Sequence, residues 1–282
     1  MNSICLGQTF QQNAVHQEHV PNLLYANELS DGTLHWNNWY AKNETEFYYT
    51  LQENDKSVIV KRAVDGNKLG VIERLPFNNE FNCSHPWVSK DGTHIIFQAS
   101  IPHPDGKRSD FNIWESFLGE SGWSKPKLYS KATSTIYHEG APILCKSGNI
   151  YFNVTKESNG EADLYVLKNG ESKAKQLPSS INSKHFEGDF FVDENEEYII
   201  FSSFEREGSL GQSDLYISFN NNGKWSKAVS LGQGINSMQQ ELSPFVTSDG
   251  QYLIFTSNRR SGSSLRPSYD HFIVNFNIEL FR

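Results

Sequence analysis

The sequence predicts an all-β protein, a five-bladed β-propeller with four antiparallel strands in each blade. The first observation is composition: the 282 residues include 19 Phe, 12 Tyr, 6 Trp, 20 Gly and 10 Pro. Aromatic residues favour strands, while Gly and Pro favour turns, so we expect many short strands. The second observation is an internal repeat of about fifty residues. The third is that each copy holds the same order of strands and turns, which is typical of a blade.

The second strand of each copy is a short apolar run that ends in an aromatic residue. The last residues of these runs are Tyr49, Phe97, Phe152, Phe201 and Phe255. A turn signal precedes each run, such as Asp91-Gly92 or Asp249-Gly250, and Asp-Gly between apolar runs predicts a hairpin because Gly tolerates positive φ. The first, innermost strand lies before that turn, at Pro86–Val88, Pro142–Leu144, Phe190–Val192 and Pro244–Val246.

A third strand follows a polar loop, and a fourth segment often contains Trp, as in 122–126 and 224–228. The fifth copy lacks this fourth segment. We therefore expect Pro21–Tyr25 to supply it, which closes the ring and leaves no free sheet edge. The predicted organisation is an N-terminal arm and closing strand over 1–28, followed by one domain over 29–282. Its five blades are expected at 29–78, 79–132, 133–181, 182–235 and 236–282.

Charge and hydropathy exclude several classes of protein. The formal net charge is −8 and no basic stripe is present, so nucleic acid is not the expected partner. No apolar run is long enough to span a membrane. The N-terminus shows no basic region followed by an apolar core, so no signal peptide is visible. The three cysteines predict thiols and no disulfide framework, and we expect a monomer.

Two segments carry a resemblance to a known family. Residues 245–259 (FVTSDGQYLIFTSNR) and 213–218 (SDLYIS), followed by Gly223-Lys224-Trp225-Ser226, resemble the TolB-type, WD-like propeller repeat of bacterial envelope proteins. The resemblance covers roughly residues 30–276. It implies the propeller fold and an extracytoplasmic or periplasmic location. It does not select a function, because the family includes binding modules, partner-docking domains and some enzymes.

Aligning the copies on their first strands produces two rows of polar residues. The first row stands three residues before the Pro position and comprises His35, Cys83, Glu139, Glu187 and Glu241. The second row stands one residue before it and comprises Asn37, His85, Ala141, Asp189 and Ser243. Residues two apart on a strand share a face, so both rows are expected to line the central channel where the innermost strands begin. Arg206, Arg259 and Arg260 are expected near the mouth.

The rows have a structural and a functional interpretation. In the structural one, Glu139, Glu187 and Glu241 are part of the repeat and hold neighbouring loops through hydrogen bonds. In the functional one, the departures from the repeat matter: His35 and Cys83 replace Glu, and His85 adds a titratable group.

Three chemistries could use the functional set. The first is a divalent metal in the channel, zinc or another transition metal, on His35, Cys83, His85 and Glu139. The second is a carbohydrate-active lyase or hydrolase acting on an acidic sugar, with the candidate catalytic residues His35, His85, Glu241 and Arg259. The third is ligand capture, in which Arg259 and Arg260 grip an anion and Trp36, Trp39 or Trp87 stacks on the ligand.

The favoured prediction is a binding propeller for a small molecule, a saccharide or a protein partner, because repeat residues explain most of the polar channel. No P-loop, dinucleotide fingerprint or nucleophile elbow is present, so the only cofactor considered is the metal. The expected ligand-binding residues are His35, Asn37, His85, Glu139, Glu187, Asp189, Glu241 and Arg259. The carbohydrate-active enzyme remains the alternative.

Overall fold

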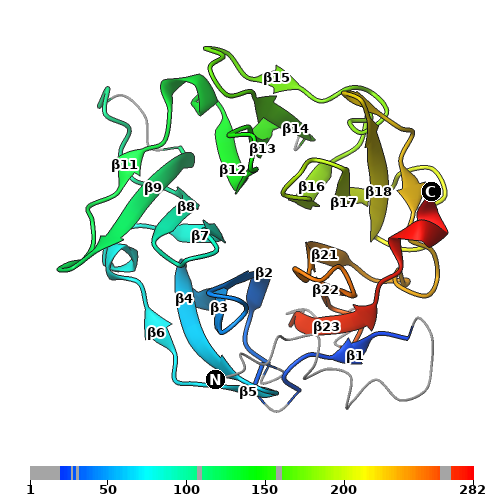
Figure 1. Ribbon diagram of the computed structural model, residues 1–282, viewed down its shortest axis with the longest axis horizontal. Coiled ribbons are helices and arrows are strands. Elements are labelled where there is room, and N and C mark those ends of the chain that lie inside the picture. Colours follow the sequence, from blue (N-terminus) through cyan, green and yellow to red (C-terminus); the bar gives the residue numbers. More distant parts are fainter. Residues whose placement is uncertain (1–19, 27, 30–31, 107–109, 157–160, 261–267) are drawn as a thin grey trace.

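A computed structural model describes residues 20–26, 28–29, 32–106, 110–156, 161–260 and 268–282. Five antiparallel sheets stand around a central channel, as Figure 1 shows in a view down the shortest axis. The predicted all-β, five-bladed propeller is confirmed. The helices of the described residues are three short 3-10 turns, η1 (Pro76–Asn79), η2 (Lys131–Thr133) and η3 (Ile278–Phe281). None of these described helices is long and apolar enough to cross a membrane.

The first two blades are built alike, from the channel outward. Blade 1 consists of β2 (His35–Ala41), β3 (Glu46–Glu53), β4 (Lys56–Asp65), β5 (Lys68–Leu69) and β6 (Glu73–Arg74). Blade 2 consists of β7 (Cys83–Val88), β8 (His94–Ala99), β9 (Asn112–Gly119), β10 (Gly122–Trp123) and β11 (Lys127–Leu128). In both, the outermost strand is split into two short pieces that pair with the same third strand.

Blade 4 keeps this plan, whereas blades 3 and 5 differ from it at the outer edge. Blade 3 consists of β12 (His138–Leu144), β13 (Ile150–Lys156), β14 (Glu161–Leu167) and β15 (Lys175–Gln176). Blade 4 consists of β16 (Glu187–Val192), β17 (Tyr198–Phe204), β18 (Ser213–Asn221), β19 (Lys224–Trp225) and β20 (Val229–Ser230). Blade 5 contributes only β21 (Glu241–Val246), β22 (Tyr252–Ser257) and β23 (Asp270–Asn275) from the C-terminal part of the chain.

The N-terminal segment completes blade 5, as the missing fourth strand predicts. β1 (Asn22–Leu23) pairs antiparallel with β23, placing Asn22 opposite Ile273 and Leu23 opposite Phe272. The next residue, Leu24, donates its N–H to the carbonyl of His271 over 2.8 Å and is buried in the core. The pairing covers the outer edge of β23, which would otherwise expose unpaired backbone groups.

The core lies between neighbouring blades. The aromatic residues that end the apolar runs are buried, four of them completely: Phe97, Phe152, Phe201 and Phe255. They belong to the second strands, so the residue that defines the repeat in the sequence is also the residue that packs blade on blade. Cys83 and Cys145 are buried free thiols, and Cys5 lies outside the described residues.

Candidate functional site

Each of the five innermost strands carries a β-bulge at the same place. The strand register shifts between Trp36 and Trp39 in blade 1, and between corresponding residues in every other blade. The second-row residue lies inside this bulge. In four blades its backbone has a positive φ although it is not glycine: Asn37 (64°), His85 (53°), Ala141 (48°) and Ser243 (51°). A bulge re-aims a side chain, and here the same device operates around the ring.

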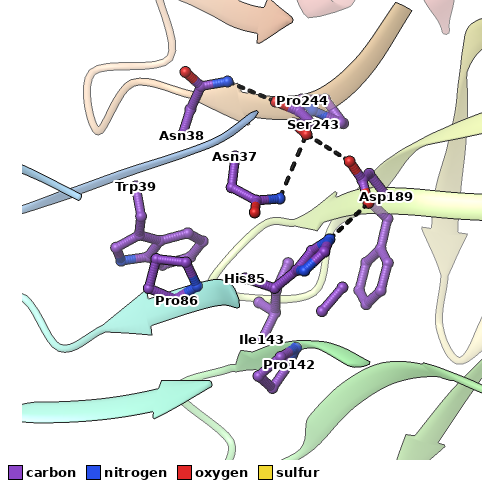
Figure 2. A pocket seen from close by; sticks show the side chains of 12 residues that line it. Asn37, Asn38, Trp39, His85, Pro86, Pro142, Ile143, Asp189, Ser243 and Pro244 are labelled. Atoms are coloured by element: carbon purple, nitrogen blue, oxygen red, sulfur yellow. Dashed lines mark hydrogen bonds and ion pairs between the residues drawn. The ribbon is translucent and has the colours of Figure 1, made fainter. Parts of the chain in front are cut away.

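The second row surrounds a pocket in the central channel (Figure 2). The pocket is small, about 30 Å³ when measured as a cavity volume, and it opens to solvent. All five second-row residues line it, together with apolar residues that follow them on the same strands. The complete lining is Asn37, Asn38, Trp39, His85, Pro86, Ala141, Pro142, Ile143, Asp189, Phe190, Ser243 and Pro244.

A hydrogen-bond network joins four blades across this pocket. His85 Nε2 lies 3.1 Å from Asp189 Oδ1, and Ser243 donates its hydroxyl to the other carboxylate oxygen. Asn37 Nδ2 donates to Ser243 Oγ over 3.4 Å. Burial alone would raise the pKa of Asp189, but its attraction to His85 and hydrogen bonds from His85 and Ser243 outweigh burial and lower that pKa. Asp189 is therefore an ionised group in the channel at neutral pH.

Both ring nitrogens of His85 are engaged. Nε2 bonds to Asp189, while Nδ1 lies 3.0 Å from the hydroxyl of Ser84. The backbone N–H of His85 donates to Thr50 Oγ1 over 3.1 Å, and Thr50 donates to Asn37 Oδ1 over 2.8 Å. The carboxylate stands between imidazole and serine, whereas a nucleophilic triad needs the imidazole between them. This arrangement does not activate Ser243 as a nucleophile.

A second buried chain links the pocket to the seam where the ring closes. Asn38 Nδ2 donates to the Ser243 carbonyl over 2.8 Å, so its Oδ1 accepts a hydrogen bond from His271 Nδ1. His271 Nε2 then accepts from His35 Nδ1 over 2.8 Å. Burial, reinforced by the proximity of His35, moves the pKa of His271 well below its ordinary value. His271 is thus a neutral imidazole at this seam.

Sequence reasoning did not single out His271, although the repeat contains a signal for it. The corresponding residues of blades 2, 3 and 4 are apolar and buried: Ile113, Leu164 and Leu215. A histidine at such a position departs from the repeat, as His35 and His85 do. The reason for this departure is the contact with His35, which lies far away in the sequence but 2.8 Å away in the structure.

The first-row side chains do not line the pocket. The prediction that both rows share one face of the innermost strand is therefore wrong. Glu241 accepts hydrogen bonds from the backbone and hydroxyl of Ser237 at 2.8 and 2.6 Å, and from Ser257 over 2.9 Å. Arg259 Nη2 lies 3.0 Å from the same carboxylate. The bulge between the rows interrupts the two-residue alternation, so first-row side chains turn into the blade while second-row side chains turn into the channel.

Glu187 and Glu139 follow the same pattern. Glu187 bonds to Ser183, Ser203 and Arg206, and its burial raises its pKa despite those partners. Glu139 accepts a hydrogen bond from Thr135 N over 3.0 Å. All three first-row glutamates are completely buried. The geometry supports the structural interpretation of this row, in which Ser/Thr-x-x-x-Glu holds the loop before each innermost strand.

The arginines expected at the mouth are also held within blades. Arg206 Nη1 donates to the Ile181 carbonyl over 2.6 Å, and the Arg259 guanidinium lies 4.9 Å above the Phe272 ring. Arg260 Nη1 lies 3.4 Å from Asp270 Oδ2. None of the three lines the pocket among the described residues. These arginines therefore do not form the predicted anion site in the pocket.

The four side chains suggested as metal ligands are not brought together. His35 bonds to His271, Glu139 bonds to Thr135, and Cys83 Sγ lies 3.8 Å from the Phe77 carbonyl. Burial raises the pKa of Cys83 to about 12, so its thiol stays protonated. In the part of the chain that the structure describes, no three His, Cys, Asp or Glu residues converge as metal ligands would.

Of the three stacking candidates, only Trp39 lines the pocket. Its ring centroid lies 6.1 Å from that of Trp87 and 5.4 Å from that of Phe245. Phe245 in turn lies 5.6 Å from Phe191. The four rings of this aromatic cluster come from four blades, and Trp39 is the one that lines the pocket.

Comparison with known proteins identifies the fold. No protein-family model matches the sequence, and no curated protein matches it. TolB from Acinetobacter baumannii is similar in structure, with a TM-score of 0.54 and 16% identity over 86% of this chain. This chain spans about half of that structure's length, 54%.

Two carbohydrate-active structures are similar as well. The catalytic domain of a GH62 α-L-arabinofuranosidase from Coprinopsis cinerea has a TM-score of 0.56 and 8% identity, over 92% of this chain and 95% of that one. A thermostable family-43 glycoside hydrolase has a TM-score of 0.53 and 12% identity, over 86% and 88%. At such identities these likenesses concern the fold alone. The chain is therefore a five-bladed β-propeller whose structural neighbours include TolB-type and glycoside hydrolase propellers.

Proposed function

We propose that this protein is a ligand-binding propeller that holds a small molecule, or a group projecting from a partner, in the channel pocket. The observation that carries the proposal is the single carboxylate of that pocket, Asp189, held between His85 and Ser243. Two amides from blade 1 and a hydroxyl from blade 5 also line the pocket, and the rest of its wall is apolar. A concave site with a few convergent polar groups on an apolar wall is the usual form of a small-ligand site.

The glycosidase alternative requires a second carboxylate. Glycoside hydrolysis uses two carboxyl groups roughly 5 to 9.5 Å apart, one as acid and one as base or nucleophile. Among the described residues, Asp189 is the only Asp or Glu that lines the pocket. Glu139, Glu187 and Glu241 are completely buried and bonded within their own blades. The pair of carboxylates that this chemistry needs is not assembled.

The lyase alternative requires a free imidazole and a cation. A general base must reach the proton that it removes, yet both nitrogens of His85 already have partners. Arg259, which the alternative needs to neutralise a sugar carboxylate, lies against Glu241 and the Ile235 carbonyl. Binding is the function that these contacts support best.

Paired variants test the proposal. His85→Gln and Asp189→Asn alter the pocket, whereas His94→Gln and Glu115→Gln alter a comparable pair in blade 2, whose atoms lie 3.0 Å apart outside the pocket. We expect calorimetric titration with saccharides and amines to find a ligand whose affinity falls at least about tenfold in the pocket variants only. Turnover of a saccharide that His85→Gln abolishes would establish the enzyme instead. Equal affinity in all four variants would place the ligand elsewhere.

A further inference from the structure

We propose that the ligand of this pocket carries a cationic nitrogen on an apolar stem, either as a small alkylammonium compound or as a lysine side chain of a partner. The inference rests on the proposed binding function and specifies its ligand class. It is argued from the charge of the lining, from the direction of its hydrogen bonds and from its apolar wall.

The pocket carries a negative charge that is only partly used. Asp189 accepts hydrogen bonds from the His85 ring and from both the hydroxyl and the backbone of Ser243. An ionised carboxylate offers about four acceptor positions, so a position remains for a donor from outside. No Lys or Arg is present among the described lining residues, and His85 is their only basic side chain. A cationic donor would therefore find an acceptor position on Asp189 beside the bonds from His85 and Ser243.

The polar side chains around the pocket donate hydrogen bonds to Asp189 or to its partner Ser243. The Ser243 hydroxyl donates to Asp189, and the Asn37 amide donates to Ser243 Oγ. The Asn38 amide donates to the Ser243 carbonyl. The Ser243 hydroxyl stabilises Asp189 directly, and the two amides stabilise Ser243. The three donors do not converge on a point where an anion would bind. The network favours a ligand that donates hydrogen bonds over one that accepts them.

The rest of the wall fits an apolar stem. Proline occupies the same strand position in three blades, as Pro86, Pro142 and Pro244, and Trp39 lies beside Pro86 (Figure 2). Ile143 and Phe190 complete the apolar side. A chain of methylene groups could lie against these residues while its ammonium reaches Asp189. The net charge of −8 also favours the approach of cations.

The same features disfavour an acidic ligand. A carboxylate in the pocket would meet the charge of Asp189 in a partly desolvated site, where like charges repel strongly. The guanidinium that would compensate, Arg259, is held by Glu241 at 3.0 Å. The acidic sugar of the alternative function is the ligand class that this pocket is least suited to bind.

Three probes of similar shape, with five to seven heavy atoms, test the charge: n-butylammonium, 1-pentanol and pentanoate. We follow the ring signals of His85 and Trp39 by NMR during titration of the intact protein. We expect n-butylammonium to bind at least about tenfold more tightly than 1-pentanol, and pentanoate not to bind. Asp189→Asn should remove this preference, whereas Glu115→Gln should keep it. Tighter binding of N-acetyl-lysine-methylamide than of n-butylammonium would indicate a lysine side chain, and the reverse a small amine.

The failures are distinguishable. If a neutral saccharide shifts the His85 and Trp39 signals and Asp189→Asn leaves its affinity unchanged, the cationic ligand class is wrong while the binding function stands. If alkylammonium binds with equal affinity to the wild type and to Asp189→Asn, the role assigned to the carboxylate is wrong. If no compound of any charge perturbs the pocket, both the ligand class and the proposed function fall.

Discussion

The two rows of residues at the start of the innermost strands are two positions apart in sequence, but they differ in their surroundings and in their hydrogen-bond partners. In the first row, Glu187 and Glu241 have the same set of partners: a serine four residues earlier, a serine on the neighbouring strand and an arginine. In the second row, His85, Asp189 and Ser243 come from three blades and bond to one another across the channel.

This comparison separates residues that the propeller fold requires in several blades from residues that can differ between blades. The three first-row glutamates are bonded within their own blades, so those blades can repeat the same solution. A second-row side chain faces its counterparts in other blades, where an imidazole, a carboxylate and a hydroxyl bond to one another. Repetition therefore marks architecture, and variation at a repeated position marks the candidate site.

The largest effect is expected in the first row. Arg259→Ala leaves the buried Glu241 carboxylate without its cation, and we expect the free energy of unfolding to fall by about 3 kcal/mol. Urea denaturation followed by circular dichroism measures it. Arg260→Ala is the control, because that side chain is 52% exposed and should cost less than about 0.5 kcal/mol. Equal losses in the two variants would refute the structural role of the first row.

An intermediate effect is expected at the seam between blades 1 and 5. The pKa of His271 is well below its ordinary value in the fold, because burial and the adjacent His35 disfavour its charge. Below about pH 6.5 this side chain binds a proton in the unfolded chain but not in the fold. Its contribution to the free energy of unfolding is therefore complete above about pH 6.5 and falls as the pH decreases. The loss from this one group approaches about 1.4 kcal/mol for each pH unit below that point.

Denaturation at pH 7.5 and pH 5.5 tests this titration. His271→Leu places at the seam the kind of residue that blades 3 and 4 have there, Leu164 and Leu215. We expect it to lower stability at pH 7.5, because His35 and Asn38 lose a partner, but to show a smaller decrease at pH 5.5 than the wild type. Parallel decreases in both proteins would show that other groups cause the pH dependence.

The smallest effect on stability is expected in the second row. The side chains of His85 and Asp189 are 17% and 18% exposed, so His85→Gln should cost less than about 1 kcal/mol while it weakens ligand binding. Thermal unfolding and titration of the same sample measure both quantities. A loss as large as that of Arg259→Ala would erase the contrast between the rows and make the pocket network a structural element.

The fold could be predicted because its signals are local. The turn at Asp91-Gly92 and the buried aromatic at Phe97 recur at matching places, and each is readable without knowing what lies opposite. The closing strand followed from a missing segment in blade 5. The split outermost strands did not follow, because pairs as short as β5 and β6 leave no periodic pattern.

The site could be predicted only in part. The second row was placed in the channel, but its first-row neighbours were placed there too, since simple alternation does not include a bulge. The bulge is hidden because Asn37, His85 and Ser243 adopt positive φ without being glycine. His271 was missed because its partner His35 is 236 residues away in the sequence. The first error concerns the local backbone of one strand, whereas the second concerns a contact between segments far apart in the sequence.

Ring closure by β1 also determines the order in which the molecule can be completed during synthesis. β1 leaves the ribosome before every other described strand, whereas its partner β23 is the last of the described strands to emerge. Four blades can assemble from neighbouring segments as they appear, but the fifth must wait for a strand from the opposite end of the chain. Until that pairing forms, the outer edge of β23 is open to other chains, so the final step of folding is also the step most exposed to aggregation.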